Sequence, residues 1–280
     1  MARGFAPGKC ILFGEHAVVY GHPAVAVAID SGVRVSIEES REWTLEGMPF
    51  EPSRHPHISH ILNRVFQYDG PPLRMEVESE LFSAAGLGSS AALSNAIGAA
   101  LQAHINPGQP LDPIALARMG HSAEAMAQKG RASPTDTATS ALGGCIVVSG
   151  EHVHGTKHVF DAELETPEGL REWSINTVEL PDNLSEACLV IGFTGEMSST
   201  GKMVAGVANL LEEQPELRDE MDAIAKITNA GLTAMSAGNL EAIGMAMDAC
   251  HEKVRILGVS SPSLESLVEA ARPHPLGAKL

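Results

Sequence analysis

The sequence predicts a two-domain α+β protein, and three observations support this class. Residues 2–38 are dominated by the two-residue alternation of strands, as in "AVAVAIDSGVRVSIEES". Residues 199–271 instead carry an almost continuous helical pattern. An apolar content of 44% supports a proper core, and with only 4% aromatic residues that core must consist mainly of aliphatic side chains. We therefore expect one domain over residues 1–182 and a second over residues 183–280.

The elements of the first domain follow one another in order. "KCILFG" and residues 24–40 are expected to form strands, and Pro7-Gly8 is expected to force a turn before Lys9. A short helix near residues 58–66, a strand at "LRMEVESE" and a helix over residues 89–104 come next. "DPIALARMGHSAEAMAQKG" begins with an Asp N-cap and a proline and ends with a glycine, which is the punctuation of a helix. "LGGCIVVSG" and "KHVF" predict further strands.

The second domain is expected to begin with a strand and to continue with helices. "ACLVIGFTG" is a continuous apolar run, which favours a strand in the centre of a sheet. The helical pattern that follows is interrupted near Gln214-Pro215, Gly238 and Gly258, so three or four helices are expected.

Charge and cysteine content limit the possible partners. A net charge of −16 argues against a nucleic-acid-binding surface, because phosphate affinity comes from Lys and Arg. No secretory leader pattern and no run of 18 apolar residues is present, so we expect no membrane association. The four cysteines lie far apart without a CxxC pair, which fits a reduced, cytoplasmic setting.

The first stretch with chemical content is "APGKCILFGEHAVVYG". Lys9 follows the expected Pro-Gly turn, and Glu15 and His16 interrupt an apolar run. Polar groups in an apolar run are costly unless they find a partner or a ligand. The alternative is that Glu15 and His16 only cap a turn.

The second stretch is "GLGSSAA". Gly86 and Gly88 let backbone N–H groups approach an anion, and Ser89 and Ser90 stand at the start of a helix whose first N–H groups lack partners. No Gly-Lys-Ser/Thr follows, so the stretch is not a Walker P-loop. The alternative is an ordinary capped helix after a flexible loop.

The third stretch, "EAMAQKGRASPTDTATS", contains two carboxylates. Glu124 lies in an expected helix and Asp136 follows a Ser-Pro turn. One carboxylate suits magnesium and the other a substrate hydroxyl, whereas the alternative is a solvated helix acid and an Asx-type turn. Together the three stretches supply a cradle, a cation, metal ligands and a group near the nucleophile, which phosphoryl transfer requires.

On these motifs the chain resembles the GHMP kinase superfamily and, within it, the mevalonate kinase family. The resemblance is carried, in order, by "GEHAVV", "GLGSSAA", "SPTDT" and "SSTGKMVAGVANLL". It implies an N-terminal α/β domain with a left-handed crossover, a helix-rich ferredoxin-like C-terminal domain and an active site in the cleft between them. It further implies Mg²⁺-dependent transfer of the γ-phosphoryl group of ATP to the 5-hydroxyl of mevalonate, in isoprenoid precursor biosynthesis.

The resemblance also implies roles for individual residues. Asp136 is the catalytic aspartate near the reacting hydroxyl, and Lys9 eases deprotonation of that hydroxyl or steadies the transferring charge. Ser90 and Glu124 hold Mg²⁺. The residues implied to wrap the ATP phosphates are Ala85, Gly86, Leu87, Gly88, Ser89 and Ser90, and those implied in the substrate region are Glu15, His16 and Thr200.

Further implications of the resemblance are a homodimer, feedback inhibition by isoprenyl diphosphates and a third glycine-rich motif that is expected to follow "GAKL". Two alternatives stay open, namely another GHMP kinase (phosphomevalonate kinase or mevalonate-3-kinase) and a non-catalytic nucleotide- or isoprenoid-binding homologue. A phosphorylated substrate calls for extra basic residues, and few are obvious. The histidines of "RHPHISH" and "HVHGTKH" are expected in exposed loops or hairpins rather than in metal sites.

Overall fold

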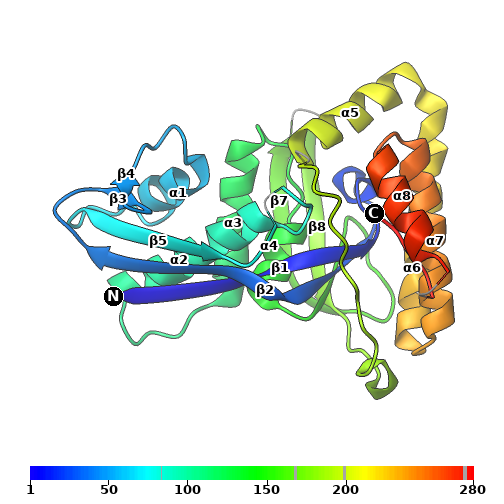
Figure 1. Cartoon of the computed structure of the whole chain (residues 1–280), viewed down its shortest axis with the longest axis horizontal. Coiled ribbons are helices and arrows are strands. Elements are labelled where there is room, and N and C mark those ends of the chain that lie inside the picture. The colour runs from blue at the N-terminus through cyan, green and yellow to red at the C-terminus, as the bar shows by residue number, and fades with distance from the viewer. Residues whose placement is uncertain (83, 167–168, 198–199, 274–275) are drawn as a thin grey trace. The chain divides into compact units, whose positions relative to one another are not determined.

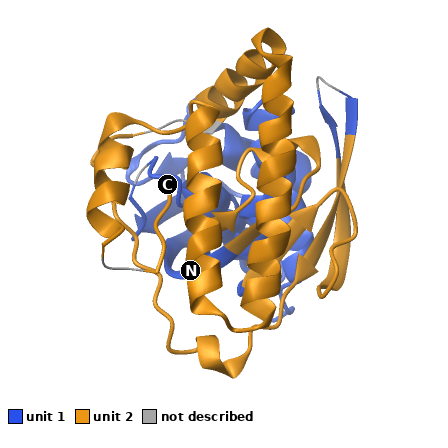
Figure 2. Cartoon of the chain, turned by 90° about the vertical axis from the view of Figure 1, so that its right-hand side faces the viewer, with its two compact units in different colours: residues 1–10, 27–144, 164–170 blue, residues 11–26, 145–163, 171–280 orange. Residues whose placement is uncertain are grey.

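The computed structural model describes residues 1–82, 84–166, 169–197, 200–273 and 276–280, apart from the side chain of Thr200. The chain forms two compact units, shown in blue and orange in Figure 2. Unit 1 comprises residues 1–10, 27–144 and 164–170, and unit 2 comprises residues 11–26, 145–163 and 171–280. The predicted boundary between residues 182 and 183 divides the chain by sequence rather than by packing, and it stays a prediction.

Unit 1 is built on a sheet in which the strand order is β4-β3-β5-β2, with β1 also paired to β2 (Figure 1). The strands are β1 (Ala2–Phe13), β2 (Ala24–Glu39), β3 (Thr44–Leu45), β4 (Met48–Pro49) and β5 (Leu73–Ser79), and residues 11–13 of β1 and 24–26 of β2 belong to unit 2. Strands β2 and β5 are antiparallel, with Val35 opposite Val77 and Ile37 opposite Met75. Because alternate residues of a strand share a face, the predicted alternation places Val33, Val35 and Ile37 together in the core.

Four helices cover the apolar face of this sheet. They are α1 (Pro56–His60), α2 (Ser89–Ile105), α3 (Pro113–Ala127) and α4 (Thr135–Leu142), and α1 continues into a π-helical turn, Ile61–Val65. The predicted N-cap of α3 is confirmed, since the side chain of Asp112 accepts a hydrogen bond from the backbone N–H of Ile114 at 2.9 Å. Side chains from α1, α2 and α3 share one buried cluster with the strand residues.

The predicted turn at Pro7-Gly8 is wrong, because strand β1 runs without a break through both residues. Within the described part of unit 1, β1 pairs with β2, and a proline is tolerated in a strand that has a free edge. The glycines serve close packing instead of a turn. A Cβ on Gly4 would lie 2.1 Å from the carbonyl oxygen of Ala96 in α2, and a Cβ on Gly8 would lie 2.9 Å from that of Leu87.

Unit 2 combines strands with a set of helices. Its strands β6 (Cys145–Ser149), β7 (Lys157–Thr166) and β8 (Gly169–Thr177) have the order β6-β8-β7. Its helices are α5 (Thr200–Glu213), α6 (Arg218–Ser236), α7 (Leu240–Ile256) and α8 (Pro262–Ala271). The breaks between them are those predicted, and α6 and α7 pack side by side (Figure 1). No helix of the described residues is both long and apolar enough to cross a membrane.

The strand predicted at residues 187–195 is absent. This segment has no strand pairing, and most of its apolar side chains are exposed, with Val190 at 90%, whereas Phe193 is half-buried. An apolar run becomes a central strand only where neighbouring strands pair with it. In the described part of unit 2, β6, β8 and β7 pair with one another and not with this segment, which explains the error.

Candidate active site

Strand β1 carries Lys9 to the glycine loop. The ammonium of Lys9 donates a hydrogen bond to the carbonyl oxygen of Gly86 at 3.0 Å, and its backbone N–H donates to that of Leu87, also at 3.0 Å. Only 7% of the lysine side chain is exposed. Strand β1 can lie this close to the loop because Gly8 has no side chain that would clash with the carbonyl oxygen of Leu87. In a Walker loop the lysine is part of the loop sequence. Here the lysine comes from strand β1, 77 residues before the loop residue Gly86.

The glycine loop has the backbone geometry of an anion cradle. Ala84, Gly86 and Gly88 have φ values of 53°, 77° and 71°, and Ala85 and Leu87 between them are not in the left-handed region. Because left-handed residues alternate with others, successive N–H groups point toward the same side of the loop, which favours anion binding. Gly88 occupies the N-cap of α2 without a side-chain capping hydrogen bond, so the first N–H groups of that helix are not capped by it.

Asp136 completes this cluster in unit 1. Its Oδ1 lies 3.1 Å from Nζ of Lys9, and a Cβ on Gly88 would lie 3.6 Å from its Oδ2. Asp136 belongs to the first turn of α4, a helix that the sequence analysis did not predict, and a carboxylate is favoured at a helix N-terminus. The hydroxyl of Ser140 holds α4 on strand β1 by donating to the carbonyl oxygen of Pro7 at 2.7 Å.

Glu124 lies buried in helix α3 with several polar neighbours, so it is not a solvated helix acid. Its Oε2 accepts a hydrogen bond from Gln128 at 2.5 Å, and its Oε1 lies 3.3 Å from Nε2 of His57. Burial alone raises the pKa of Glu124, but the close imidazole of His57, together with hydrogen bonds from Ser90 and Gln128, holds the pKa below its ordinary value. Glu124 is therefore a buried carboxylate that is ionised at neutral pH.

The chemistry of Ser90 and Glu124 fits a magnesium ion. Oε1 of Glu124 is buried and lacks an aligned hydrogen bond, and the hydroxyl of Ser90 bonds the same carboxylate. Mg²⁺ prefers a few hard oxygens from the protein together with phosphate and water. In the described part of the chain no group of three or more His, Cys, Asp or Glu side chains forms an all-protein metal site. The donor set thus suits an ion that also binds the nucleotide.

Glu15 and His16 belong to unit 2. Glu15 is buried and forms an ion pair with Lys279, and its Oε2 accepts a hydrogen bond from Sγ of Cys250 at 3.6 Å. Burial, reinforced by the negative charge of Glu15, raises the pKa of the Cys250 thiol to about 12. His16 has a φ of 63°, which is uncommon outside glycine, and it stands at the N-cap of a 3-10 helix, Ala17–Tyr20.

Thr200, the remaining predicted substrate residue, begins helix α5, and its side chain lies outside the described part of the structure.

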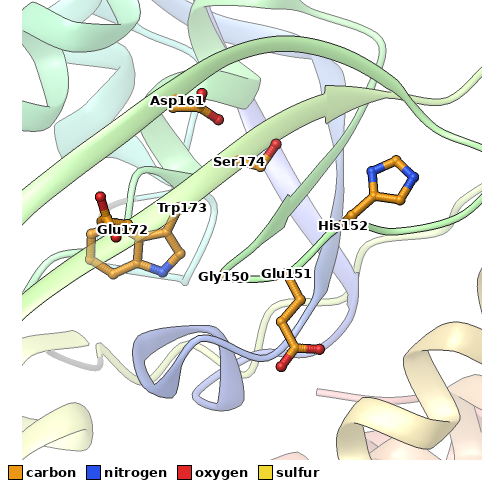
Figure 3. A pocket seen from close by; sticks show the side chains of 7 residues that line it. All are labelled: Gly150, Glu151, His152, Asp161, Glu172, Trp173 and Ser174. Atoms are coloured by element: carbon orange, nitrogen blue, oxygen red, sulfur yellow. The ribbon is translucent and has the colours of Figure 1, made fainter.

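A surface pocket of about 310 Å³ lies in unit 2, where the residues that follow strand β6 meet the middle of strands β7 and β8 (Figure 3). Its charged lining is acidic, with Glu151, Asp161 and Glu172 beside His152. Carboxylates repel phosphate, and none of the predicted site residues lines this pocket. The pocket is therefore not a nucleotide site.

The comparisons with known proteins agree with the clustered motifs. The family described as "GHMP kinases N terminal domain" matches residues 57–144. Mevalonate kinase of Methanothermobacter thermautotrophicus is 33% identical over 275 residues, which is 95% of this chain and 82% of that relative. The chain belongs to the mevalonate kinase family. Mevalonate kinase of Archaeoglobus fulgidus is likewise 33% identical, over 98% of this chain and 86% of its own.

The fold of the mevalonate kinase family is also found. A crystal structure of L. major mevalonate kinase in complex with R-mevalonate matches 100% of this chain and 83% of its own, with a TM-score of 0.74 at 23% identity. The predicted family and α+β GHMP kinase fold are confirmed. As a member of the mevalonate kinase family the chain is an ATP-dependent small-molecule kinase.

Two polar residues of this mevalonate kinase family member were missed in the sequence analysis. Gln128 lies one helical turn after Glu124, a spacing that could have indicated the contact. His57 was expected in an exposed loop, but it belongs to helix α1 and contacts Glu124 from 67 positions away in the numbering, so no local pattern indicated it.

Glu124 should make the stability of this mevalonate kinase family member depend on pH. Its folded-state pKa is below the ordinary value of 4.5, so it contributes stability above that pH, and this contribution is lost as the pH falls through the folded-state pKa. We expect the difference in unfolding free energy between the unsubstituted chain and Glu124→Gln to stay constant from about pH 7 to about pH 5 and to shrink as the pH falls below about 4.5, in urea titrations. Glu78→Gln, at an exposed position of β5, should show no such trend. A constant difference for Glu124→Gln would contradict the expectation.

Proposed function

We propose that the chain transfers the γ-phosphoryl group of ATP to the 5-hydroxyl of mevalonate, giving 5-phosphomevalonate for isoprenoid precursor biosynthesis. The 33% identity to mevalonate kinases along nearly the whole chain carries the proposal. The contact of Lys9 with both Gly86 and Asp136 adds a chemical reason, because it joins a cation, a phosphate cradle and a carboxylate.

In this proposal Asp136 and Lys9 serve the acceptor hydroxyl. The carboxylate of Asp136 accepts a hydrogen bond from that hydroxyl and orients its oxygen toward the γ-phosphorus. As the bond from this oxygen to the γ-phosphorus forms, the bond from the γ-phosphorus to the bridging oxygen of ATP breaks, ADP leaves, and an Oδ atom of Asp136 takes the hydroxyl proton. The ammonium of Lys9 is held by Gly86 and Asp136, so its charge is already in place when negative charge moves across the transferring group.

The glycine loop and the buried carboxylate serve the nucleotide. Backbone N–H groups of residues 85–90 hold the phosphate oxygens of ATP, and Ser90 and Glu124 would hold Mg²⁺. When bound, this ion neutralises charge on the phosphates. Glu15, His16 and Thr200 remain predicted substrate residues.

The wider expectations are part of the same proposal. A cytoplasmic location is supported by the four cysteines, all of which are free. A homodimer and inhibition by isoprenyl diphosphates are supported by the resemblance of the motifs, and size-exclusion chromatography with light scattering tests the first.

A coupled assay of ADP release tests the proposed reaction. We expect turnover with mevalonate and background rates with galactose, homoserine and phosphomevalonate, because the family relatives are mevalonate kinases. Phosphorus NMR of the product separates 5-phosphorylation from 3-phosphorylation. A background rate with mevalonate, or a product phosphorylated at the 3-hydroxyl, would contradict the proposal.

A further inference from the structure

Helix α1 presents two imidazoles to helix α3. Nε2 of His57 lies 3.3 Å from Oε1 of Glu124, and Nε2 of His60 lies 3.0 Å from the hydroxyl oxygen of Ser122. The two histidines are one helical turn apart, so they share a face of α1. Both contacts join the same pair of helices, but only His57 reaches the carboxylate.

The neighbours of Glu124 restrict how its carboxylate can turn. Oε2 is engaged by Gln128 at 2.5 Å, and Oε1 faces His57. Both Oε1 of Glu124 and Nε2 of His57 are buried and lack an aligned hydrogen bond. Because the two oxygens of the carboxylate are equivalent, only a partial rotation about the last torsion of Glu124 changes these contacts. Such a rotation would move Oε1 away from His57 and Oε2 away from Gln128, which is unfavourable for buried oxygens.

We propose that His57 is a positioning residue for the magnesium site, acting through Glu124. The inference rests on the proposed function, because it assigns Mg²⁺ to Glu124 and Ser90. The imidazole holds Oε1 from the side of α1 while Gln128 holds Oε2 from within α3, so the carboxylate is already oriented when the ion arrives. Groups that orient a metal ligand in this way raise metal affinity without touching the ion.

The roles of the two histidines can be separated by matched substitutions on the same helix. His57→Phe keeps a ring but removes the nitrogen that faces Oε1, and His57→Gln places an amide nitrogen at a similar reach. His60→Phe is the control, since it removes the contact to Ser122 and leaves that to Glu124 intact. If thermal unfolding shows that His57→Phe is not folded, His57→Asn replaces it, because that side chain is too short to reach Oε1.

The primary readout is metal binding rather than turnover. Mn²⁺, used as a paramagnetic substitute for Mg²⁺, is titrated with the full chain and a non-hydrolysable ATP analogue, and free Mn²⁺ is followed by electron paramagnetic resonance. We expect His57→Phe to weaken Mn²⁺ binding by about 10- to 100-fold, and His57→Gln to restore most of the affinity. His60→Phe should bind Mn²⁺ like the unsubstituted chain. In the ADP-release assay, His57→Phe should require more Mg²⁺ but keep its kcat at saturation.

Equal weakening in His57→Phe and His60→Phe would overturn the inference, because the cause would then be the packing of α1 on α3. Unchanged affinity in His57→Phe would overturn it as well. The proposed function fails separately, if the unsubstituted chain binds Mn²⁺ with the nucleotide analogue but releases no ADP with mevalonate.

Discussion

Replacing Asp136 with asparagine should lower kcat by about 10²- to 10⁴-fold while nucleotide binding stays close to that of the unsubstituted chain. Asparagine keeps the shape of the side chain but removes the charge that accepts a proton and attracts the ammonium of Lys9, 3.1 Å away. The glycine loop keeps its own contacts to Lys9 through Gly86 and Leu87, so the cradle for ATP remains.

Steady-state kinetics with mevalonate, together with calorimetric titration of a non-hydrolysable ATP analogue, measure the two effects. Asp112→Asn is the matched control in the same unit, because Asp112 caps helix α3 and asparagine caps equally well. Undiminished turnover in Asp136→Asn would remove Asp136 from the mechanism.

Replacing Lys279 with methionine should lower the free energy of unfolding by about 3–5 kcal/mol. The side chains of Lys279 and Glu15 are 4% and 9% exposed, and Lys279 also donates to the carbonyl oxygen of Ile11 at 3.2 Å. Removing the ammonium leaves the carboxylate of Glu15 buried beside Cys250 without a neutralising charge. Chemical denaturation followed by circular dichroism measures the loss.

Two further variants test the cause of this loss. Lys253→Met removes a lysine that is 32% exposed and pairs with Glu220, so it should cost at most about 1 kcal/mol. Adding Glu15→Gln to Lys279→Met should recover much of the stability, because no unpaired charge is then buried. Equal losses in Lys279→Met and Lys253→Met would show that burial of the ion pair does not matter.

Helices were the part of the fold that the sequence predicted best, because their ends are marked locally. Asp112 was predicted to begin a helix and Gly238 to mark a break between helices. In the structure Asp112 is the N-cap of α3, and α6 ends at Ser236, just before Gly238. Helix α4 was missed since it is short and begins after Pro134 without a side-chain capping hydrogen bond. The segment at residues 187–195 was misjudged because strand formation depends on neighbouring strands, which lie elsewhere in the sequence.

The sequence predicted those residues of the candidate site whose chemical role is indicated by the motif in which they stand. Lys9, Gly86 and Asp136 were singled out separately, and the structure brings them within hydrogen-bonding distance. Their catalytic roles remain predictions. His57 could not be predicted in this way, because "RHPHISH" does not show that folding places the carboxylate of Glu124 beside this histidine.

The supply of the lysine from strand β1 has a consequence for synthesis of the chain. Lys9 is made before its acceptor Gly86, 77 residues later, and ribosomes add about 5–20 residues per second. For several seconds the nascent strand therefore has neither helix α2 against Gly4 nor a carbonyl or carboxylate for the ammonium. A nascent chain stalled before Gly86 should expose β1 to chaperones, and the contact of Lys9 with Asp136 should form only after α4 has left the ribosome.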